Sequence, residues 1–358
     1  MKRILPALIL TLAIFGLLIP AIQAQDTEYP DIPRVDIHAH IRDNAILDDY
    51  LGMAELLKDD CGAELVMWVN LSTSLKSGRQ GLEEMKRVEK EYNGRFLHTI
   101  NDYRIADGLG YSPEELAWWH RQGVVGFKIW VGVSPLSDHP ANDPIYTKME
   151  QLGMVGASVH ISQPYPTRWC ESPIDFWESQ LAWVRVLDRH PDLVVVMAHM
   201  QDFFNSDEQL DFLRYLMETY PNYNVDLAAR FQQFSRMDRD NLRDFCIDYQ
   251  DRIFFGTDIA DQPARDAEAA AAGYNRCFRL LETGEIVEGG GFFSDRSSQG
   301  LDLPREVLEK IYYKNAVRLY PRIGKVLDRL GWEVALDSNS GEGPHSEENT
   351  ESWLPDPR

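Results

Sequence analysis

The sequence has few cysteines and no second long apolar run after its N-terminus. Its four cysteines, Cys61, Cys170, Cys246 and Cys277, lie far apart, and the sequence contains no C-x-x-C pair. A chain of 358 residues does not need disulfides to fold, so free buried thiols are expected for most of the four. Since no second apolar run is present, a mature protein without a membrane-spanning helix is expected.

Basic residues are also scarce. The chain has 36 lysines and arginines against 57 aspartates and glutamates, which gives a formal net charge of −21. A chain this acidic is not expected to bind nucleic acid or an anionic membrane surface. A small anionic substrate stays compatible with the sequence, because the local charge of a pocket can differ from the total.

The N-terminus has the features of a secretory signal peptide. Lys2 and Arg3 give a positive start, residues 4–22 are apolar and uncharged, and a small residue at position 24 offers a cleavage site. A membrane anchor is the alternative, but two prolines in the segment and the cleavage site favour removal. Residues 1–24 are therefore predicted to be a signal peptide and the protein to be exported, either to the periplasm or out of the cell.

Short β-rich apolar runs alternate with amphipathic segments along most of the chain. The predicted strands are 34–40, 64–70, 95–100, 124–131, 155–162, 193–200, 223–228 and 252–258. The predicted helices are 45–58, 82–92, 113–121, 145–152, 174–189, 208–220, 239–249 and 264–281. Alternation of this kind indicates βαβ units with a parallel sheet, and eight units indicate an α/β fold of the (β/α)₈ TIM-barrel type.

Two further helices, 304–319 and 322–330, are expected to pack against the barrel. The predicted barrel domain with these helices covers residues 25–335. Residues 336–358 are rich in Ser, Gly, Glu, Asn and Pro and are predicted to form a disordered acidic tail.

The first predicted strand reads V-D-I-H-A-H and is unusually polar for a barrel core. Because side chains alternate along a strand, Asp36, His38 and His40 are expected to point the same way, into the barrel. Burial of three such groups without partners would be costly. The pattern therefore predicts that other strands supply polar partners for these three side chains.

Four other predicted strands supply polar groups near their C-terminal ends, where active sites of this fold lie. The residues are Lys128 in G-F-K-I-W, His160 after A-S-V, His199 after V-M-A and Asp258 after F-G-T. Neutral imidazoles and a carboxylate suit zinc or a similar divalent ion. The predicted metal ligands are His38, His40, His160 and Asp258.

The same residues suggest catalytic roles. A metal lowers the pKa of a bound water towards about 7, and Asp258 is expected to accept the water's proton as well as ligate. His199 is predicted to be a ligand or the acid/base beside the metal. The sequence leaves three roles open for Lys128. It bridges two metal ions if it is carboxylated, contacts the substrate, or acts as a structural cation paired with a carboxylate. Asp36 and Ser158 are expected to orient the ligating imidazoles rather than bind the metal.

Aromatic and basic residues near the predicted mouth give a substrate hypothesis. Arg168 follows the fifth strand, Arg230 follows the seventh, and Trp130 lies two residues after Lys128. Aromatic walls with arginines suit a planar or sugar-like substrate that carries a carboxylate. The alternative is that the two arginines only neutralise nearby carboxylates in an acidic protein.

The sequence resembles the amidohydrolase superfamily, in particular its amidohydrolase-related (amidohydrolase 2) branch. The resemblance spans about residues 33–320 and lies in D-I-H-A-H at 36–40, G-F-K at 126–128, V-H at 159–160, A-H at 198–199 and G-T-D at 256–258. It implies a distorted TIM barrel in which the first-strand histidines, His160 and Asp258 hold a divalent metal. In this branch one ion is more usual than two. Zinc is the expected ion, with manganese or iron as alternatives.

The resemblance does not decide the reaction, because the branch contains hydrolases as well as decarboxylases and hydratases. The leading prediction is a metal-dependent hydrolase that uses metal-bound water to cleave a lactone, ester or amide bond of a small carboxylated substrate. A metal-dependent decarboxylase is the alternative, and a non-catalytic binding protein is the third reading. The sequence leaves the oligomeric state open, and a homodimer is compatible with it.

Overall fold

A computed structural model describes residues 26–72, 79–102, 110–130, 137–161, 172–290 and 296–334. The predictions for residues 1–24 and 336–358 fall outside these ranges, as do those for Arg168 and Cys170.

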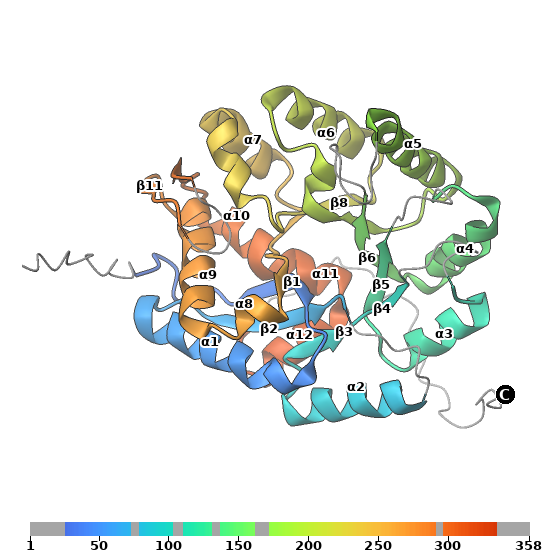
Figure 1. Ribbon diagram of the computed structural model, residues 1–358, viewed down its shortest axis with the longest axis horizontal. Coiled ribbons are helices and arrows are strands. Elements are labelled where there is room, and N and C mark those ends of the chain that lie inside the picture. Colours follow the sequence, from blue (N-terminus) through green and yellow to red (C-terminus); the bar gives the residue numbers. More distant parts are fainter. Residues whose placement is uncertain are drawn as a thin grey trace, which may run out of the picture.

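Parallel strands form the middle of the molecule, and helices surround them (Figure 1). The strands of the barrel are β1 (Arg34–His40), β2 (Leu65–Asn70), β3 (Phe96–His98), β4 (Ile100–Asp102), β5 (Gly126–Trp130), β6 (Val155–His160), β7 (Val195–Met197), β8 (Tyr223–Asp226), β9 (Ile253–Phe254) and β10 (Ile259–Ala260). Their hydrogen-bonded orders are β10-β1-β2-β3 and β4-β5-β6-β7-β8-β9.

The two sheets are parts of one barrel. Only Thr99 separates β3 from β4, and the backbone N–H of Val125 donates to His98 O at 3.0 Å, so the break is local. The barrel closes where the N–H of Ile37 donates to Phe255 O and the N–H of Asp258 donates to His38 O, at 3.2 and 2.9 Å. The predicted (β/α)₈ barrel is confirmed, with the eighth strand split around Asp258.

The helices follow the predicted segments closely. They are α1 (Leu47–Cys61), α2 (Arg79–Glu91), α3 (Pro113–Arg121), α4 (Asp143–Leu152), α5 (Pro173–Arg189), α6 (Asp207–Thr219), α7 (Arg239–Asp248), α8 (Asp261–Ala264) and α9 (Ala267–Glu282). Ser112 and Ser172 each form a capping box, in which the hydroxyl accepts from the third helical N–H, before a proline at the helix start. These local signals explain why the helix starts were readable from the sequence.

The C-terminal helices pack against the barrel, as predicted. They are α10 (Arg305–Glu309), the π-helical turn η6 (Lys310–Lys314), α11 (Asn315–Leu319) and α12 (Pro321–Arg329). In the π-helical turn the carbonyl of Ile311 accepts from the N–H of Phe255 in the barrel wall, at 2.9 Å. The side-chain amide of Asn315 donates to Ile253 O at 2.8 Å. A small hairpin of β11 (Ile286–Val287) and β12 (Ser298–Gln299) precedes these helices.

Strand β1 does not alternate regularly. Its pairing with β2 shifts register between Asp36 and Ala39. The Asp36 carboxylate accepts from Tyr274 Oη of helix α9 at 2.5 Å and from the N–H of His38 at 2.8 Å. The prediction that Asp36 shares a face with His38 and His40 is wrong, because the register shift turns Asp36 towards α9. It bonds the backbone of His38 rather than an imidazole ring.

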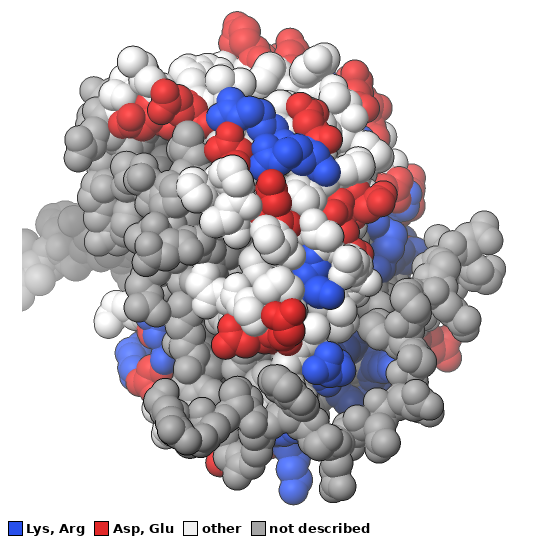
Figure 2. Space-filling model, turned by 90° about the vertical axis from the view of Figure 1, so that its right-hand side faces the viewer, with Lys and Arg blue, Asp and Glu red and all other residues white. Residues whose placement is uncertain are grey.

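The described helices include none that is long and apolar enough to cross a membrane. Cys61, Cys246 and Cys277 are buried free thiols, which agrees with the expectation for most of the cysteines. On the face shown in Figure 2, acidic and basic side chains are interspersed with uncharged ones.

Candidate metal centre

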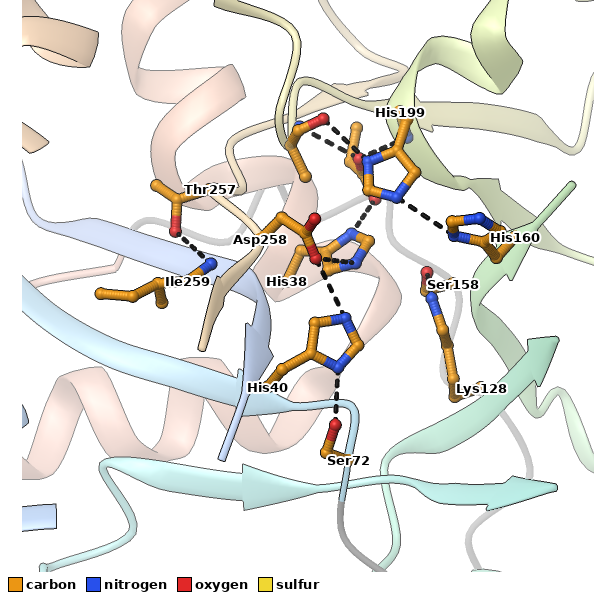
Figure 3. A network of polar contacts seen from close by, with 12 residues as sticks. His38, His40, Ser72, Lys128, Ser158, His160, His199, Thr257, Asp258 and Ile259 are labelled. Atoms are coloured by element: carbon orange, nitrogen blue, oxygen red, sulfur yellow. Dashed lines mark hydrogen bonds and ion pairs between the residues drawn. The ribbon is translucent and has the colours of Figure 1, made fainter. Parts of the chain in front are cut away.

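Three predicted ligands converge at the C-terminal ends of the strands. His38 Nε2 and His40 Nε2 lie 3.4 and 3.0 Å from the same oxygen, Asp258 Oδ1. Figure 3 shows the Asp258 carboxylate between the two rings. Suitable ligand atoms of these three residues all lie within 4.8 Å of one another. The geometry thus brings together residues from the first and the last unit of the barrel.

The orientation of His38 is fixed by Asp226, a residue that the sequence analysis missed. Asp226 Oδ2 accepts from His38 Nδ1 at 2.8 Å, and both side chains are fully buried. Burial opposes ionisation of Asp226, but the nearby His38 holds the pKa of this carboxyl below its usual value. Since Nδ1 carries the proton, Nε2 presents a lone pair to the site. This Nε2 is buried and makes no hydrogen bond with any described residue.

His40 is oriented by Ser72, which the sequence analysis also missed. His40 Nδ1 lies 2.6 Å from Ser72 Oγ. A hydroxyl can donate or accept, so Ser72 supports either tautomer and allows Nε2 to present a lone pair. Burial lowers the pKa of His40 to about 4 in spite of Asp258, so the ring is neutral at neutral pH, as a metal ligand must be.

His199 and His160 form a second pair beside these ligands. His199 Nδ1 lies 2.9 Å from Ala228 O, and because a carbonyl only accepts, Nδ1 carries the proton. His199 Nε2 is then a lone pair, and it lies 3.2 Å from His160 Nδ1. Burial lowers the pKa of His199 to about 3 and lowers that of His160 well below its usual value.

Two triads of ligand-type atoms occur in the described part of the chain, and they share His38. One consists of His38, His40 and Asp258, and the other of His38, His199 and Asp226. His160 belongs to neither and reaches the site through His199. The structure therefore assembles three of the four predicted ligands, while His160 as a ligand stays a prediction.

The backbone that presents His199 is unusual. His199, Met200, Gln201 and Asp202 have φ values of 59°, 53°, 52° and 60°. This left-handed conformation costs an L-residue roughly 1–2 kcal/mol each, because Cβ crowds the following carbonyl. Four such residues in succession at a candidate site indicate a conformation that surrounding contacts must hold.

Lys128 lies across the site from these histidines. Its Nζ donates to Ser158 Oγ at 2.6 Å, and the side chain is fully buried (Figure 3). Burial lowers the pKa of Lys128 to about 8, against the opposing effect of Asp258 and Asp226. Ser158 therefore orients the lysine rather than an imidazole in the contacts that the structure defines.

Asp258 itself sits at a break in the last strand, with φ 68°. Burial would raise the pKa of this carboxyl, but the hydrogen bond with His40 and the neighbouring imidazoles hold it well below its usual range. The adjacent G-T-D motif also has a packing reason. A Cβ at Gly256 would lie 2.8 Å from His38 Cβ, so only glycine lets the two strand ends approach this closely.

The predicted substrate-binding residues are less well supported. Arg230 is buried and pairs with Asp202 at 2.6 Å, which matches the alternative that it neutralises a nearby carboxylate. Arg168 and the side chain of Trp130 lie outside the described part of the structure. A substrate contact by any of the three stays a prediction. Asp226 could have been found from the sequence, since it is a polar residue near the end of the predicted strand 223–228.

The donor set fits a divalent metal. A buried Nε2 without a hydrogen bond, a second neutral imidazole and an ionised carboxylate point at one place, and each imidazole is held by its other nitrogen. Three such protein ligands are typical of a catalytic rather than a structural site, because positions remain open for water or substrate.

Comparison with known families gives a match over residues 35–322 to the amidohydrolase 2 family, described as Amidohydrolase. The chain belongs to the amidohydrolase 2 family. Members of the family include hydrolases and decarboxylases, and its enzymes act on small molecules. No curated protein matches the sequence.

Solved structures of low sequence identity share the fold of this family member. An uncharacterized TIM-barrel protein from Bordetella bronchiseptica is 14% identical with a TM-score of 0.51, over 82% of this chain and 100% of that one. A 5-carboxyvanillate decarboxylase from Novosphingobium aromaticivorans, solved with manganese and 3-methoxy-4-hydroxy-5-nitrobenzoic acid, is 12% identical with a TM-score of 0.53, over 83% and 99%. Such similarities concern the fold alone, and they agree with the TIM barrel described above.

Proposed function

We propose that this amidohydrolase 2 family member is a metal-dependent hydrolase that cleaves an ester, lactone or amide bond of a small carboxylated molecule. The observation that carries the proposal is the convergence of His38 Nε2 and His40 Nε2 on Asp258 Oδ1. The proposed ligands are these three residues with His160 or His199. Zinc is the proposed ion, with manganese or iron as alternatives, and one ion is proposed rather than two.

A divalent cation held there would act as a Lewis acid for a carbonyl oxygen and lower the pKa of a water molecule towards about 7. The side chain of Asp258 is 33% exposed and ionised at neutral pH, so it is placed to accept the proton of the attacking water. His199 exchanges protons only at Nε2, because its Nδ1–H is bound to Ala228 O. Lys128 supplies a cation for the carboxylate or the developing negative charge of the substrate.

A decarboxylase is the second candidate, and the buried cation of Lys128 is the observation that favours it. A substrate carboxylate would bind beside the metal and Lys128, and His199 Nε2 would first accept a proton from a substrate hydroxyl or from water and then pass it to carbon as CO₂ leaves. Both reactions use the same residues, so the product distinguishes them.

The test begins with metal analysis of the purified protein by mass spectrometry. We expect one equivalent of metal in the wild type, loss of that metal in His40→Ala and no loss in His139→Ala, a control at an exposed histidine. The metal-loaded protein is then offered a panel of lactones, esters, amides and aromatic carboxylates, with hydrolysis products and CO₂ measured separately. CO₂ release without hydrolysis would select the decarboxylase. No metal and no turnover after addition of Zn²⁺ or Mn²⁺ would leave the non-catalytic reading.

We also propose that the protein is exported by residues 1–24. Cell fractionation of the full chain and of a variant without these residues tests this, and retention of both in the cytoplasm would contradict it.

A further inference from the structure

The left-handed turn His199–Asp202 has no role in the ligand set beyond His199 itself, yet all four side chains are buried. A turn without glycine in this conformation persists only if its surroundings fix it. Asp226 bonds the start of the turn, and the other contacts that fix it come from Asp202 and Gln180, which bond none of the proposed metal ligands.

We propose that Asp202 and Gln180 are positioning residues that hold this turn and thereby direct His199 towards the metal centre. The inference rests on the proposed function in so far as His199 takes part in the reaction. It assigns a role to two polar side chains that the metal site does not use.

Asp202 closes the turn through an ion pair. Its Oδ1 lies 2.6 Å from Arg230 Nη2, with side-chain exposures of 2% and 6%. Arg230 is held in turn by Gln233, whose amide oxygen, in the orientation that satisfies both of its groups, accepts from Nη1 at 3.3 Å. A charge buried this deeply has little freedom to move, because it must keep its counter-charge.

Gln180 reaches into the turn from helix α5. Its Nε2 donates to the backbone carbonyl of Gln201 at 3.1 Å, and its Oε1 accepts from Gln201 Nε2 at 2.5 Å. One amide thus binds both the main chain and the side chain of the same residue.

The start of the turn is tied to the metal ligands. The N–H of His199 donates to Asp226 Oδ1 at 2.9 Å, while Oδ2 of the same carboxylate holds His38. The turn is therefore fixed to Asp226 at one end and to Arg230 at the other, with Gln180 between them. Loss of the Asp202–Arg230 ion pair, or of the hydrogen bonds from Gln180, lets the backbone relax and turns the His199 ring away from the metal centre.

The experiment compares Asp202→Asn and Gln180→Met with Glu282→Gln. Glu282 forms another buried ion pair, with Arg34 at 2.7 Å, and serves as the matched control. Histidines are labelled with ¹⁵N, and the Nδ1–H signal of His199, assigned by its absence in His199→Gln, is followed by NMR. We expect this signal to shift in Asp202→Asn and Gln180→Met and to stay unchanged in Glu282→Gln.

Kinetics with the substrate found above give the second readout. We expect kcat per folded molecule to fall at least about tenfold in both variants, with KM within about twofold, since misplacement of a catalytic group mainly affects the reaction step. Arg230→Gln should match Asp202→Asn, and Arg230→Lys, which keeps a cation beside Asp202, should recover part of the loss. A rise in KM for the arginine variants alone would instead make Arg230 a substrate contact and overturn its place in this arrangement.

An unchanged His199 signal in both Asp202→Asn and Gln180→Met would overturn the proposal whatever the activity. A shifted signal in a protein that neither hydrolyses nor decarboxylates any substrate would refute the proposed function and leave the positioning role standing. If Asp202→Asn does not fold, Gln180→Met still decides, because it removes two hydrogen bonds without leaving a buried charge.

A separate observation concerns the outer faces of α5 and α6. Large apolar side chains are exposed there: Ile174 by 67%, Trp177 by 50%, Leu181 by 49%, Phe212 by 40% and Tyr215 by 61%. The first three follow a spacing of three and four residues on one side of α5. Ring centroids of Trp177 and Phe212 lie 6.4 Å apart and those of Phe212 and Tyr215 6.3 Å apart, so the residues form one α5–α6 surface.

We infer that a second copy of this chain covers the α5–α6 surface. At about 200 Å² per large side chain, the exposed fractions correspond to about 500 Å² of apolar area. A standard interface covers about 800 Å² of each partner, and about 65% of a homodimer interface is apolar. The surface therefore supplies about the whole apolar part of one side of such an interface. A two-fold axis would place the same residues opposite each other.

Sedimentation velocity over a range of concentrations tests this inference on the full chain. We expect a dimer in the wild type, and at least about tenfold weaker association in Ile174→Glu and Tyr215→Glu, because buried carboxylates would face each other. Ile286→Glu is the control, since Ile286 is 62% exposed on β11, outside this surface. A monomeric wild type, or a dimer that both variants leave intact, would overturn the inference. Binding to neutral lipid vesicles that Tyr215→Glu abolishes would show a membrane surface instead.

Discussion

The two ends of strand β1 both carry buried polar groups, but the two clusters are satisfied in different ways. At the start, the guanidinium of Arg34 pairs with Glu282 at 2.7 Å and lies over the rings of Phe278 and Tyr312, at 4.7 and 4.9 Å. Tyr312 Oη also donates to Glu282 Oε1 at 2.9 Å. Charge meets counter-charge in this cluster, so its charges are neutralised within the protein, although Arg34 Nε is buried without a hydrogen bond to any described residue.

At the other end, the Nε2 atoms of His38 and His40 converge on one carboxylate oxygen, Asp258 Oδ1, at 3.4 and 3.0 Å. His38 Nε2 has no hydrogen bond within the described part of the chain, although it is buried. Burial without satisfaction is costly, and a divalent cation would satisfy His38 Nε2. The difference teaches that residue types alone do not separate a structural polar cluster from a functional one. The geometry does, because two imidazoles and a carboxylate that converge on one point can share a metal ion, whereas Arg34 and Glu282 neutralise each other.

The largest contrast between the two ends is expected in metal content. His38→Ala removes a residue that belongs to both triads, so we expect the affinity for Zn²⁺ or Mn²⁺ to fall by at least about 10³-fold, with activity lost. Glu282→Gln should keep full metal content. Mass spectrometry of metal per folded protein measures both, and a metal-replete His38→Ala would refute the site assignment.

The second contrast concerns stability, where the larger loss is expected at the Arg34–Glu282 end of the strand. Glu282→Gln leaves the Arg34 charge buried without its partner, so the free energy of unfolding should fall by about 3–5 kcal/mol. Asp258→Asn, measured after chelation of metal, should change it by no more than about 1 kcal/mol, because the site is arranged for function. Urea denaturation provides the numbers. An equal fall in the free energy of unfolding in the two variants would show that the two clusters contribute equally to stability and would contradict this contrast.

A smaller effect is expected from the residue that orients His38. Asp226→Asn keeps the shape of the side chain but weakens the preference for the proton on Nδ1. Loss of such an outer partner typically reduces metal affinity 10- to 100-fold. Calorimetric titration with Zn²⁺ measures this, and Asp36→Asn serves as comparison because Asp36 bonds the backbone of His38, Thr257 and Tyr274 but no imidazole ring. A metal affinity in Asp226→Asn equal to that of the wild type would show that Asp226 does not orient His38 for metal binding.

The smallest expected effect is that of pH on the metal affinity. Burial lowers the pKa of His40 to about 4 and that of His199 to about 3, so both rings stay neutral when an exposed histidine would become charged. Between about pH 7.5 and 5.5 we expect metal affinity to change less than about threefold. Stability of the metal-free protein should be full above pH 6.5 and fall towards pH 4, since the unfolded chain then binds more protons than the folded one. A tenfold loss of affinity at pH 5.5 would contradict the neutral-ligand assignment.

Much of the fold could be predicted from local signals. The period of the apolar runs, the serine caps at residues 112 and 172 and the proline positions determine where elements lie, because each depends on neighbours within a few residues. The strand split at Asp258 and the shift in β1 could not be predicted in this way. Both depend on how strands from opposite ends of the chain close the barrel.

The sequence by itself determined the barrel, the family resemblance and the histidines and aspartate at the strand ends, since period and position within a strand are local properties. Only the tertiary structure turned Asp36 towards α9, brought Asp226 to His38 and bent the chain at His199–Asp202 into a left-handed turn. These features result from contacts between residues far apart in the sequence, and their directions appear only when the barrel closes.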